Sequence, residues 1–249
     1  MINIKSASDI AKMKIAGRIT GEALKLAGES IKPGMTTKEL DTIIHDYIVS
    51  QGAVPSFLGY GGFPASACIS INNEVIHGIP GKRKIHEGDI VSIDVGAFIG
   101  GFHGDSARTF AVGKITKDDE DLMRVTEESL YKGIEKAVAG NRIGDISAAI
   151  EEHVRKFGFG VVKEYIGHGV GRKLHEEPEV PNYGKAGHGP RLVPGMVIAI
   201  EPMINFKGDG VRVLGDDWTV VTKSGSSSAH FEHTIAITSD KPILLTKVD

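Results

Sequence analysis

The sequence is poor in cysteine. Cys68 is the only one among 249 residues, so neither an internal disulfide nor a cysteine-rich zinc module can form. Long apolar runs are also missing, since none approaches the ~18 residues that a membrane-spanning helix needs. Residues 1–14 carry scattered charges and no apolar stretch, so they do not resemble a secretory signal. Together these absences predict a cytoplasmic protein with no membrane partner.

Charge of neither sign is in large excess. The net charge of −3 gives no reason to expect nucleic acid or an anionic membrane as a partner. Several catalytic signatures are absent as well: there is no G-x-S-x-G elbow, no Walker loop and no H-E-x-x-H motif. The chemistry that these motifs support is therefore not indicated.

The stretch GDIVSIDVGAFIGGFHGDSARTFAVG, residues 88–113, predicts a β-hairpin with Gly100-Gly101 as its two-residue turn. This turn pairs Asp94 with Ala107. Asp105 is then a diagonal neighbour of Asp94 on the same face, roughly 7–8 Å away. Two solvated strand aspartates are the simplest interpretation, but the apolar neighbours of Asp94, Ile93 and Val95, disfavour it. Burying both without compensation would be very costly, so on an apolar hairpin either one is protonated or cations lie between them.

The rest of the chain alternates helices, short strands and glycine-rich loops. Helical spacing of apolar residues predicts helices at Ala7–Ser30 with Ser8 as N-cap, from Thr36 or Thr37 to Gly52, at Thr116–Ala139 and at Asp145–Phe157. Strands are predicted at Ala67–Ile71, Val75–Ile76 and Met196–Ile200, with a last hairpin formed by Trp218–Thr222 and Phe231–Ile237. Loops are predicted at residues 59–64 and, bearing histidines, at residues 165–184.

Two parts of this pattern repeat, which predicts an internal duplication. The segments 34–52 and 140–158 both begin and end with glycine, and the run G-D-I-V-S-I-D ending at Asp94 matches G-M-V-I-A-I-E ending at Glu201. Corresponding carboxylates would converge at an approximate two-fold axis between the halves. We therefore expect a single α+β catalytic domain, residues 1–249, made of two halves, residues 1–113 and 114–249.

The duplication suggests a set of metal-ligand candidates: Asp94, Asp105, Glu201 and Glu232, with one or more of His77, His168 and His175. Four carboxylates and an imidazole suit two divalent ions about 3.5–4 Å apart. Oxygen-rich ligation favours Mn, Fe, Co or Zn without naming one of them. Such ions make bound water acidic and polarise a carbonyl, which indicates hydrolysis of an amide or ester, with a carboxylate ligand as base.

The histidines differ in their surroundings. The three candidates lie in Gly- or Pro-containing segments, where backbone can approach a ligand closely. Four others are interpreted as surface or core residues: His45, His86, His153 and His188. The roles of three more stay undecided: His103, His230 and His233.

At these residues the chain closely resembles the methionine aminopeptidases, specifically the short bacterial form of type I. The resemblance covers essentially the whole chain through the motifs INNEVIHGIPG, SIDVGAF, GFHGDSARTF, GHGVGRKLHEEP, IEPM and HFEHT. It implies the pita-bread α+β fold, with two pseudo-two-fold-related halves, antiparallel sheet inside and helices outside. Glu201 and Glu232 are 31 residues apart, which leaves no room for the type II insert. The single cysteine excludes the zinc extension of longer type I forms.

The resemblance also implies roles for individual residues. A dinuclear metal site would be formed by Asp94, Asp105, His168, Glu201 and Glu232. Asp105 and Glu232 would bridge the two ions. Glu201 would help to activate water, and His77 and His175 would contact the substrate and the tetrahedral intermediate. The methionine side chain would lie among Tyr60, Phe63, Cys68, Leu174 and Trp218. Apolar, aromatic and sulfur surfaces suit a flexible thioether.

The leading hypothesis is a metal-dependent exopeptidase that removes the initiator methionine from nascent chains. It would prefer a small second residue, because the site lies in a confined cleft. We expect a monomer whose partners are nascent peptides and not nucleic acid, with contact to the ribosome left open. Two alternatives are an aminopeptidase of the Xaa-Pro type and a catalytically silent peptide-binding module on the same scaffold.

Overall fold

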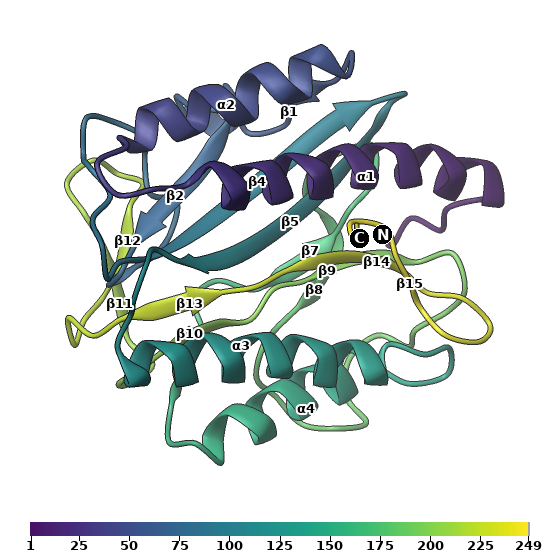
Figure 1. The fold of residues 1–249 in the computed structure, drawn as a ribbon. Helices are drawn as coiled ribbons and strands as arrows, with labels where there is room; N and C mark the ends of the chain where they lie inside the picture. Colours follow the sequence, from purple (N-terminus) through teal and green to yellow (C-terminus); the bar gives the residue numbers. More distant parts are fainter. Residues whose placement is uncertain (249) are drawn as a thin grey trace.

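The computed structural model describes residues 1–248, in which helices on two sides enclose layers of antiparallel strands (Figure 1). Helices α1 (Ala7–Ser30) and α2 (Thr37–Ser50) cover one side, and α3 (Lys117–Lys136) and α4 (Ile143–Arg155) cover the other. A short 3-10 helix, η1 (Tyr60–Gly62), lies in the predicted loop at residues 59–64. The predicted α+β architecture is confirmed. Over the described residues, no helix combines the length and the apolar character needed to cross a membrane.

The strands of residues 1–248 form four sheets. The first contains β1 (Val54–Pro55), β2 (Ala67–Ile71), β4 (Ile90–Ile99) and β5 (Phe102–Ala111). The second contains β6 (Gly160–Val161), β10 (Met203–Asn205) and β13 (Ser228–His230). The third contains β3 (Glu74–Ile76), β11 (Val211–Val213) and β12 (Val220–Thr222). The fourth contains β7 (Gly167–Gly169), β8 (Glu176–Val180), β9 (Val197–Ile200), β14 (His233–Ala236) and β15 (Ile243–Leu244).

Strands β4 and β5 form the predicted hairpin. Asp94 pairs with Ala107, and Gly96 pairs with Asp105, so the predicted register is confirmed. The turn residues Gly100-Gly101 have φ values of 62° and 85°, the left-handed conformation that a tight hairpin turn requires at both positions.

The helix starts follow local capping signals. Of the two predicted N-cap candidates of α2, Thr36 and Thr37, it is Thr36 that caps the helix, by accepting a hydrogen bond from the N–H of Glu39. The predicted N-cap of α1 is wrong, because Ser6 and not Ser8 caps this helix. The Ser6 side chain accepts from the N–H of Asp9, and the Asp9 carboxylate accepts from the N–H of Ser6. This reciprocal capping box satisfies two backbone N–H donors. A helix that began at Ser8 would not have it.

Two predictions in the second half are wrong. Residues 165–184, predicted as a loop, contain β7 and β8, which pair with each other. The two segments of the predicted last hairpin do not pair: β12 joins β3 and β11, whereas β14 joins β9 and β15. These strands are only three to five residues long. At that length, strand pairing depends on tertiary neighbours more than on local pattern.

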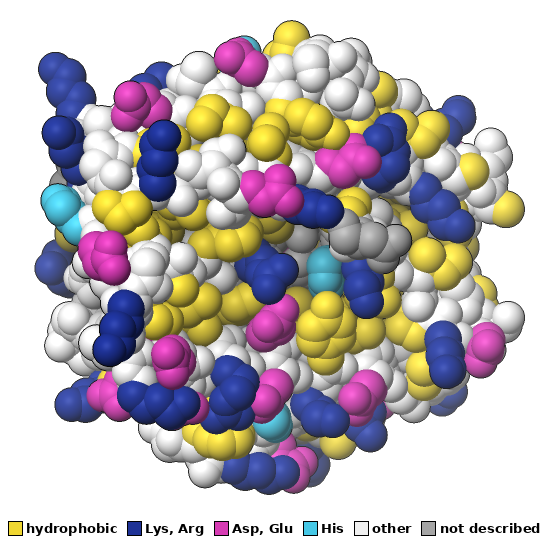
Figure 2. All heavy atoms as spheres, viewed as in Figure 1, with side chains coloured by type: hydrophobic (Ala, Val, Ile, Leu, Met, Phe, Trp, Pro, Cys, Tyr) yellow, Lys and Arg dark blue, Asp and Glu magenta, His cyan; other side chains and the backbone are white. Residues whose placement is uncertain are grey.

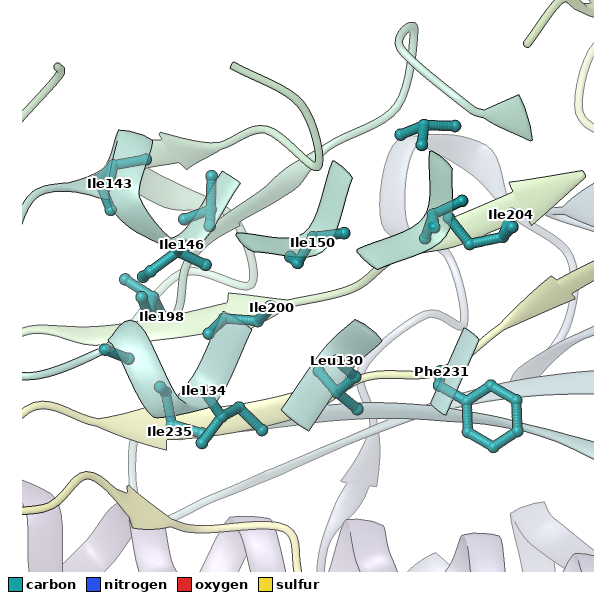
Figure 3. Packing of buried hydrophobic residues seen from close by; sticks show 14 of the residues in the cluster. Leu130, Ile134, Ile143, Ile146, Ile150, Ile198, Ile200, Ile204, Phe231 and Ile235 are labelled. Carbon is teal, nitrogen blue, oxygen red and sulfur yellow. The ribbon is translucent and has the colours of Figure 1, made fainter. Parts of the chain in front are cut away.

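The largest hydrophobic cluster joins α3 and α4 to the strands of the second half. Figure 3 shows Leu130 and Ile134 of α3 and Ile150 of α4 in this cluster with Ile200 of β9. A second cluster packs α1 and α2 against β2 and β4. Helices α1 and α2 therefore back the strand that carries Asp94, and α3 and α4 back the strand that leads into Glu201.

Helix α1 lies unusually close to its neighbours. It carries Gly17 and Gly21, which each weaken an exposed helix by about 1 kcal/mol relative to alanine. A Cβ atom on either glycine would overlap the backbone carbonyl of Leu245 or Thr246. A Cβ on Gly104 of β5 would in turn lie 2.8 Å from the backbone nitrogen of Gly17. The glycines thus let α1 lie directly on the part of β5 that leads into Asp105.

The face formed by α1 and α3 carries charges of both signs. Figure 2 shows basic and acidic side chains intermingled there, with hydrophobic side chains between them. Pairs such as Arg124 and Glu128, with an N···O distance of 3.0 Å, link some of them. Exposed pairs of this kind contribute only about 0.2–1 kcal/mol each. The mixture agrees with the small net charge of the sequence.

Candidate metal centre and substrate cavity

Four predicted carboxylate ligands come from strand segments that meet at one place. Asp94 lies on β4 and Asp105 on β5. Glu201 directly follows β9, and Glu232 lies between β13 and β14. All four line the same cavity, and Asp105 and Glu232 are almost fully buried there. The structure therefore brings together acidic residues that are far apart in the sequence.

Hydrogen bonds between β5 and the segment leading into β14 hold two of these carboxylates beside each other. The N–H of Glu232 donates to the carbonyl of Ala107 at 2.8 Å, and the N–H of Asp105 donates to the hydroxyl of Thr234 at 3.1 Å. The Ser106 hydroxyl donates to the carbonyl of Glu232 at 2.7 Å. Because these bonds hold the backbone at the acidic residues, the fold itself fixes the positions from which the two carboxylate side chains extend.

His168 of β7 adds a nitrogen ligand to this group. Its Nδ1 lies 2.9 Å from the carbonyl oxygen of Gly169, which can only accept, so Nδ1 carries the proton. Nε2 of the neutral ring is then free to coordinate. It lies 3.6 Å from Oδ2 of Asp105 and 3.4 Å from Oε1 of Glu201. Burial lowers the pKa of His168 to about 3, which keeps the ring neutral. An imidazole oriented in this way is typical of a metal ligand.

The carboxylates lack the hydrogen-bond donors that a buried charge needs. Among the described residues, Oδ1 of Asp94, Oδ1 of Asp105 and Oε1 of Glu232 are buried without a partner. Burial raises the pKa of Asp94 to about 7. Burial and the neighbouring acidic groups raise the pKa values of Asp105, Glu201 and Glu232 well above their usual range. Ligand atoms of Asp105, His168 and Glu232 lie within 4.8 Å of one another. This donor set fits divalent cations, which would compensate the buried negative charge.

The cavity at this cluster has a volume of about 200 Å³, and its wall includes all the residues that the sequence predicted for substrate binding: Tyr60, Phe63, Cys68, His77, Leu174, His175 and Trp218. Phe63 and Trp218 meet edge to face with ring centroids 5.1 Å apart. Cys68 lies opposite Asp94 on paired strands, and burial raises the pKa of its thiol. The wall is therefore apolar, aromatic and uncharged next to an acidic floor.

His77 and His175 lie beside the metal-ligand candidates. Nδ1 of His175 is 2.7 Å from the Tyr60 hydroxyl, and its ring centroid is 4.1 Å from that of His168. His77 has a φ of 59°, a conformation that few residues other than glycine adopt. Its ring meets Trp218 edge-on with a centroid distance of 6.1 Å, and burial lowers its pKa to about 4. Backbone held in this conformation by its surroundings is frequent at functional sites.

His230, whose role the sequence left undecided, also lines the cavity. It is 1% exposed, and its Nε2 lies 3.7 Å from Oε2 of Glu201 and has no hydrogen-bond partner within residues 1–248. The available signal was its position two residues before Glu232, since alternate residues of an extended segment share a face. His103 and His233 bond to the hydroxyls of Ser56 and Thr246 and lie outside this cavity.

The sequence matches metallopeptidase family M24 over residues 11–239. A methionine aminopeptidase of Clostridium acetobutylicum is 54% identical over 99% of both chains. Methionine aminopeptidase 1 of Bacillus subtilis is 53% identical over the full length of both. This chain belongs to the methionine aminopeptidases of family M24. It is therefore a metal-dependent peptide hydrolase.

Solved structures give the same fold. The crystal structure of methionine aminopeptidase from Thermotoga maritima superposes with a TM-score of 0.98 at 46% identity and covers all of both chains. The prolidase of Pyrococcus furiosus superposes with a TM-score of 0.80 at 25% identity, and the match covers 99% of this chain but 66% of that one. The predicted pita-bread fold is thus confirmed, and the likeness to the methionine aminopeptidase is the stronger of the two.

Proposed function

We propose that the enzyme hydrolyses the first peptide bond of chains that begin with methionine. The observation that supports this most directly is the combination of an acidic, histidine-containing floor with an apolar, aromatic wall in one cavity of about 200 Å³. The floor supplies the groups for hydrolysis, and the wall offers an unbranched thioether a soft, complementary surface. The family membership and the full-length relatives favour the same activity.

Two divalent ions, of Co, Mn, Fe or Zn, are the proposed cofactors, held by Asp94, Asp105, His168, Glu201 and Glu232. The unpartnered buried oxygens and the free Nε2 of His168 support this ligand set. When bound, such ions lower the pKa of water and polarise a carbonyl.

Glu201 is the proposed general base. Its carboxylate is buried on the floor of the cavity, and its two oxygens face the Nε2 atoms of His168 at 3.4 Å and His230 at 3.7 Å. Burial and the neighbouring Asp94 raise its pKa, so its carboxylate is a stronger base than that of an exposed glutamate once bound cations keep it ionised. We assign it the proton that leaves the attacking water and later moves to the departing amine.

His77 and His175 are the proposed substrate contacts. If the Tyr60 hydroxyl donates to Nδ1 of His175, the neutral ring carries its proton on Nε2. That N–H can then donate to the carbonyl oxygen as negative charge develops on it, which is where a preorganised donor is most effective. His77, next to Trp218, would hold the substrate backbone beside the apolar wall.

The chain is further proposed to be one catalytic domain built from duplicated halves, residues 1–113 and 114–249. Matched glycines at the ends of the repeated segments support this. Gly34 and Gly140 have φ values of 89° and 97°, and Gly52 and Gly158 have 72° and 77°. A monomeric state, a cytoplasmic location and contact with the ribosome remain predictions.

The test is release of the first residue from Met-Ala-Ser, Met-Lys-Ser and Ala-Pro-Ser by metal-stripped protein during a titration with each metal. We expect metal-dependent cleavage of Met-Ala-Ser, slower cleavage of Met-Lys-Ser and none of Ala-Pro-Ser. Equal rates on the first two would contradict the preference for a small second residue. Preferred cleavage of Ala-Pro-Ser would establish an Xaa-Pro peptidase, and no turnover with any metal would favour a peptide-binding module.

A further inference from the structure

A buried ion pair ties the N-terminal segment to the loop that carries His175. Nζ of Lys5 lies 2.7 Å from Oε2 of Glu176, and both side chains are only 5% exposed. Nζ also donates to the carbonyl of Asn3 at 3.1 Å, and the Asn3 amide donates to the same Glu176 oxygen at 3.1 Å. None of these three residues belongs to the metal-ligand set or lines the substrate cavity described above.

The Glu176 carboxylate also bonds to the backbone of the connection between β7 and β8. Its other oxygen, Oε1, accepts the N–H of Lys173 at 3.2 Å. The carboxylate also packs so closely on Gly171 that a Cβ atom there would overlap it. Gly171 is held in turn, because its carbonyl accepts the N–H of His103 at 2.9 Å. Oε1 of Glu176 therefore holds the loop together, while Oε2 ties the loop to the N-terminal segment.

The N-terminal segment that supplies Lys5 is itself fixed. The N–H of Lys5 donates to the carbonyl of Gly195 at 2.8 Å, just before β9. Burial alone would raise the pKa of Glu176, but the hydrogen bonds from Lys5 and Asn3 outweigh burial and hold that pKa below its usual value. The carboxylate is thus ionised, and Lys5 is the cation that compensates it.

His175 directly precedes Glu176 and lines the cavity. The contacts of Glu176 with Lys5, Asn3 and Lys173, which we call the brace, therefore end next to the cavity. The register of β7 and β8 pairs Glu176 with Gly169, the residue after His168. A brace at Glu176 therefore sets where the His175 ring stands relative to both His168 and Tyr60. Loss of Lys5 would take from this carboxylate the one cationic partner that the described part of the chain shows for it, so the carboxylate would move toward water or become protonated. Either change would alter the loop.

We propose that Lys5 is a positioning residue, which acts through Glu176 to hold the His175 ring in place for hydrolysis. This inference rests on the proposed function, in which His175 contacts the reacting carbonyl. Misplacing a catalytic group by about 1 Å can lower the rate about 100-fold. Lys5→Met should therefore lower kcat about 10- to 100-fold, change KM little and leave metal content unchanged.

The test is a double-mutant cycle on Met-Ala-Ser hydrolysis with Lys5→Met, His175→Ala and both together. Lys5→Met should lower kcat in the wild-type background but not in the His175→Ala background, because residues that act as a unit are not additive. An equal loss in both backgrounds, or no loss in the wild type, would overturn the proposal. If Lys5→Met does not fold, Lys5→Gln removes the charge but keeps a donor and gives the same comparison.

A second readout does not depend on turnover. Hydrogen exchange of the metal-free protein should be faster at the Lys173 amide in Lys5→Met than in the wild type. The matched control is Arg155→Met, which removes an ion pair to Asp209 outside the site. It should change neither the exchange at Lys173 nor kcat. Unchanged exchange at Lys173 in Lys5→Met would refute the brace. Absence of activity in the wild-type enzyme would refute the proposed function instead.

Discussion

Removal of the metal ions should make the folded enzyme progressively less stable as the pH rises above 7. The cause is the acidic floor of the cavity. Burial raises the pKa of Asp94 to about 7, and the pKa values of Asp105, Glu201 and Glu232 are raised well above their usual range. Without cations, the folded protein therefore holds protons that the unfolded chain has already lost.

The sign and size follow from this difference in bound protons. Between the unfolded and folded pKa values of a carboxyl group, the native state binds more protons, so stability falls as pH rises. For Asp94, from 3.8 to about 7, the difference of about 3 pKa units corresponds to about 4 kcal/mol. Above pH 7, every carboxyl group that remains protonated in the folded state costs about 1.4 kcal/mol per pH unit.

The buried histidines have the opposite effect, but in another pH range. Burial lowers the pKa values of His77, His168 and His230 to between about 3 and about 4. Their contribution to stability is complete above the unfolded pKa of about 6.5 and is lost as the pH falls below it. From pH 7 to 8.5 the histidine contribution is nearly complete, so a fall in stability reports the groups whose pKa values burial raises, which are the carboxyl groups and, near pH 8.5, the Cys68 thiol.

The assay is urea denaturation of chelator-treated protein at pH 7, 7.5, 8 and 8.5, repeated with excess Mn²⁺ or Co²⁺. Metal-free protein should lose stability across this range. Metal-loaded protein should gain more from the ions at pH 8.5 than at pH 7, because coordination releases protons. Glu232→Gln, which removes one ionisable group, serves as the control and should show a smaller slope when metal-free. A metal-free stability that is constant or rises with pH would refute the reasoning.

Three further results are expected. Glu201→Gln should lower kcat for Met-Ala-Ser by about 10²- to 10⁴-fold, and metal content measured by elemental analysis in excess metal should be retained; a loss below tenfold would contradict its role as base. His230→Leu should lower kcat more than His230→Gln, because glutamine keeps a hydrogen-bond donor toward Glu201. Equal rates would exclude a role for His230 as a donor to Glu201. Gly17→Ala should lower the free energy of unfolding by about 1–3 kcal/mol in urea, because the new methyl group overlaps the carbonyl of Leu245; a gain of about 1 kcal/mol would show that helix propensity prevails.

Local signals in the sequence were sufficient for much of the fold. The Gly100-Gly101 turn fixed the hairpin and its register, because a two-residue turn leaves one pairing of the flanking strands. The sequence also limited the N-cap of α2 to Thr36 or Thr37, and the structure has Thr36 there. The sheet partners of β12 and β14 did not follow completely, since each pairs with one strand that is distant in the sequence, β3 and β9 respectively. Short strands of this kind carry no local sign of their partner.

The candidate site shows the same division between local and non-local information. The carboxylates could be found because an acidic residue at the end of an apolar strand conflicts with its surroundings, and that conflict is visible in sequence. Lys5 gives no such sign: it lies 171 residues from Glu176, in a segment whose sequence has the scattered charges of an ordinary N-terminus. Only the burial of both groups shows that the lysine is needed, since a buried charge requires a partner wherever the chain can supply one. Residues that supply the chemistry can therefore be predicted from their local misfit, whereas residues that hold them in place must be found by following buried charges through the folded structure.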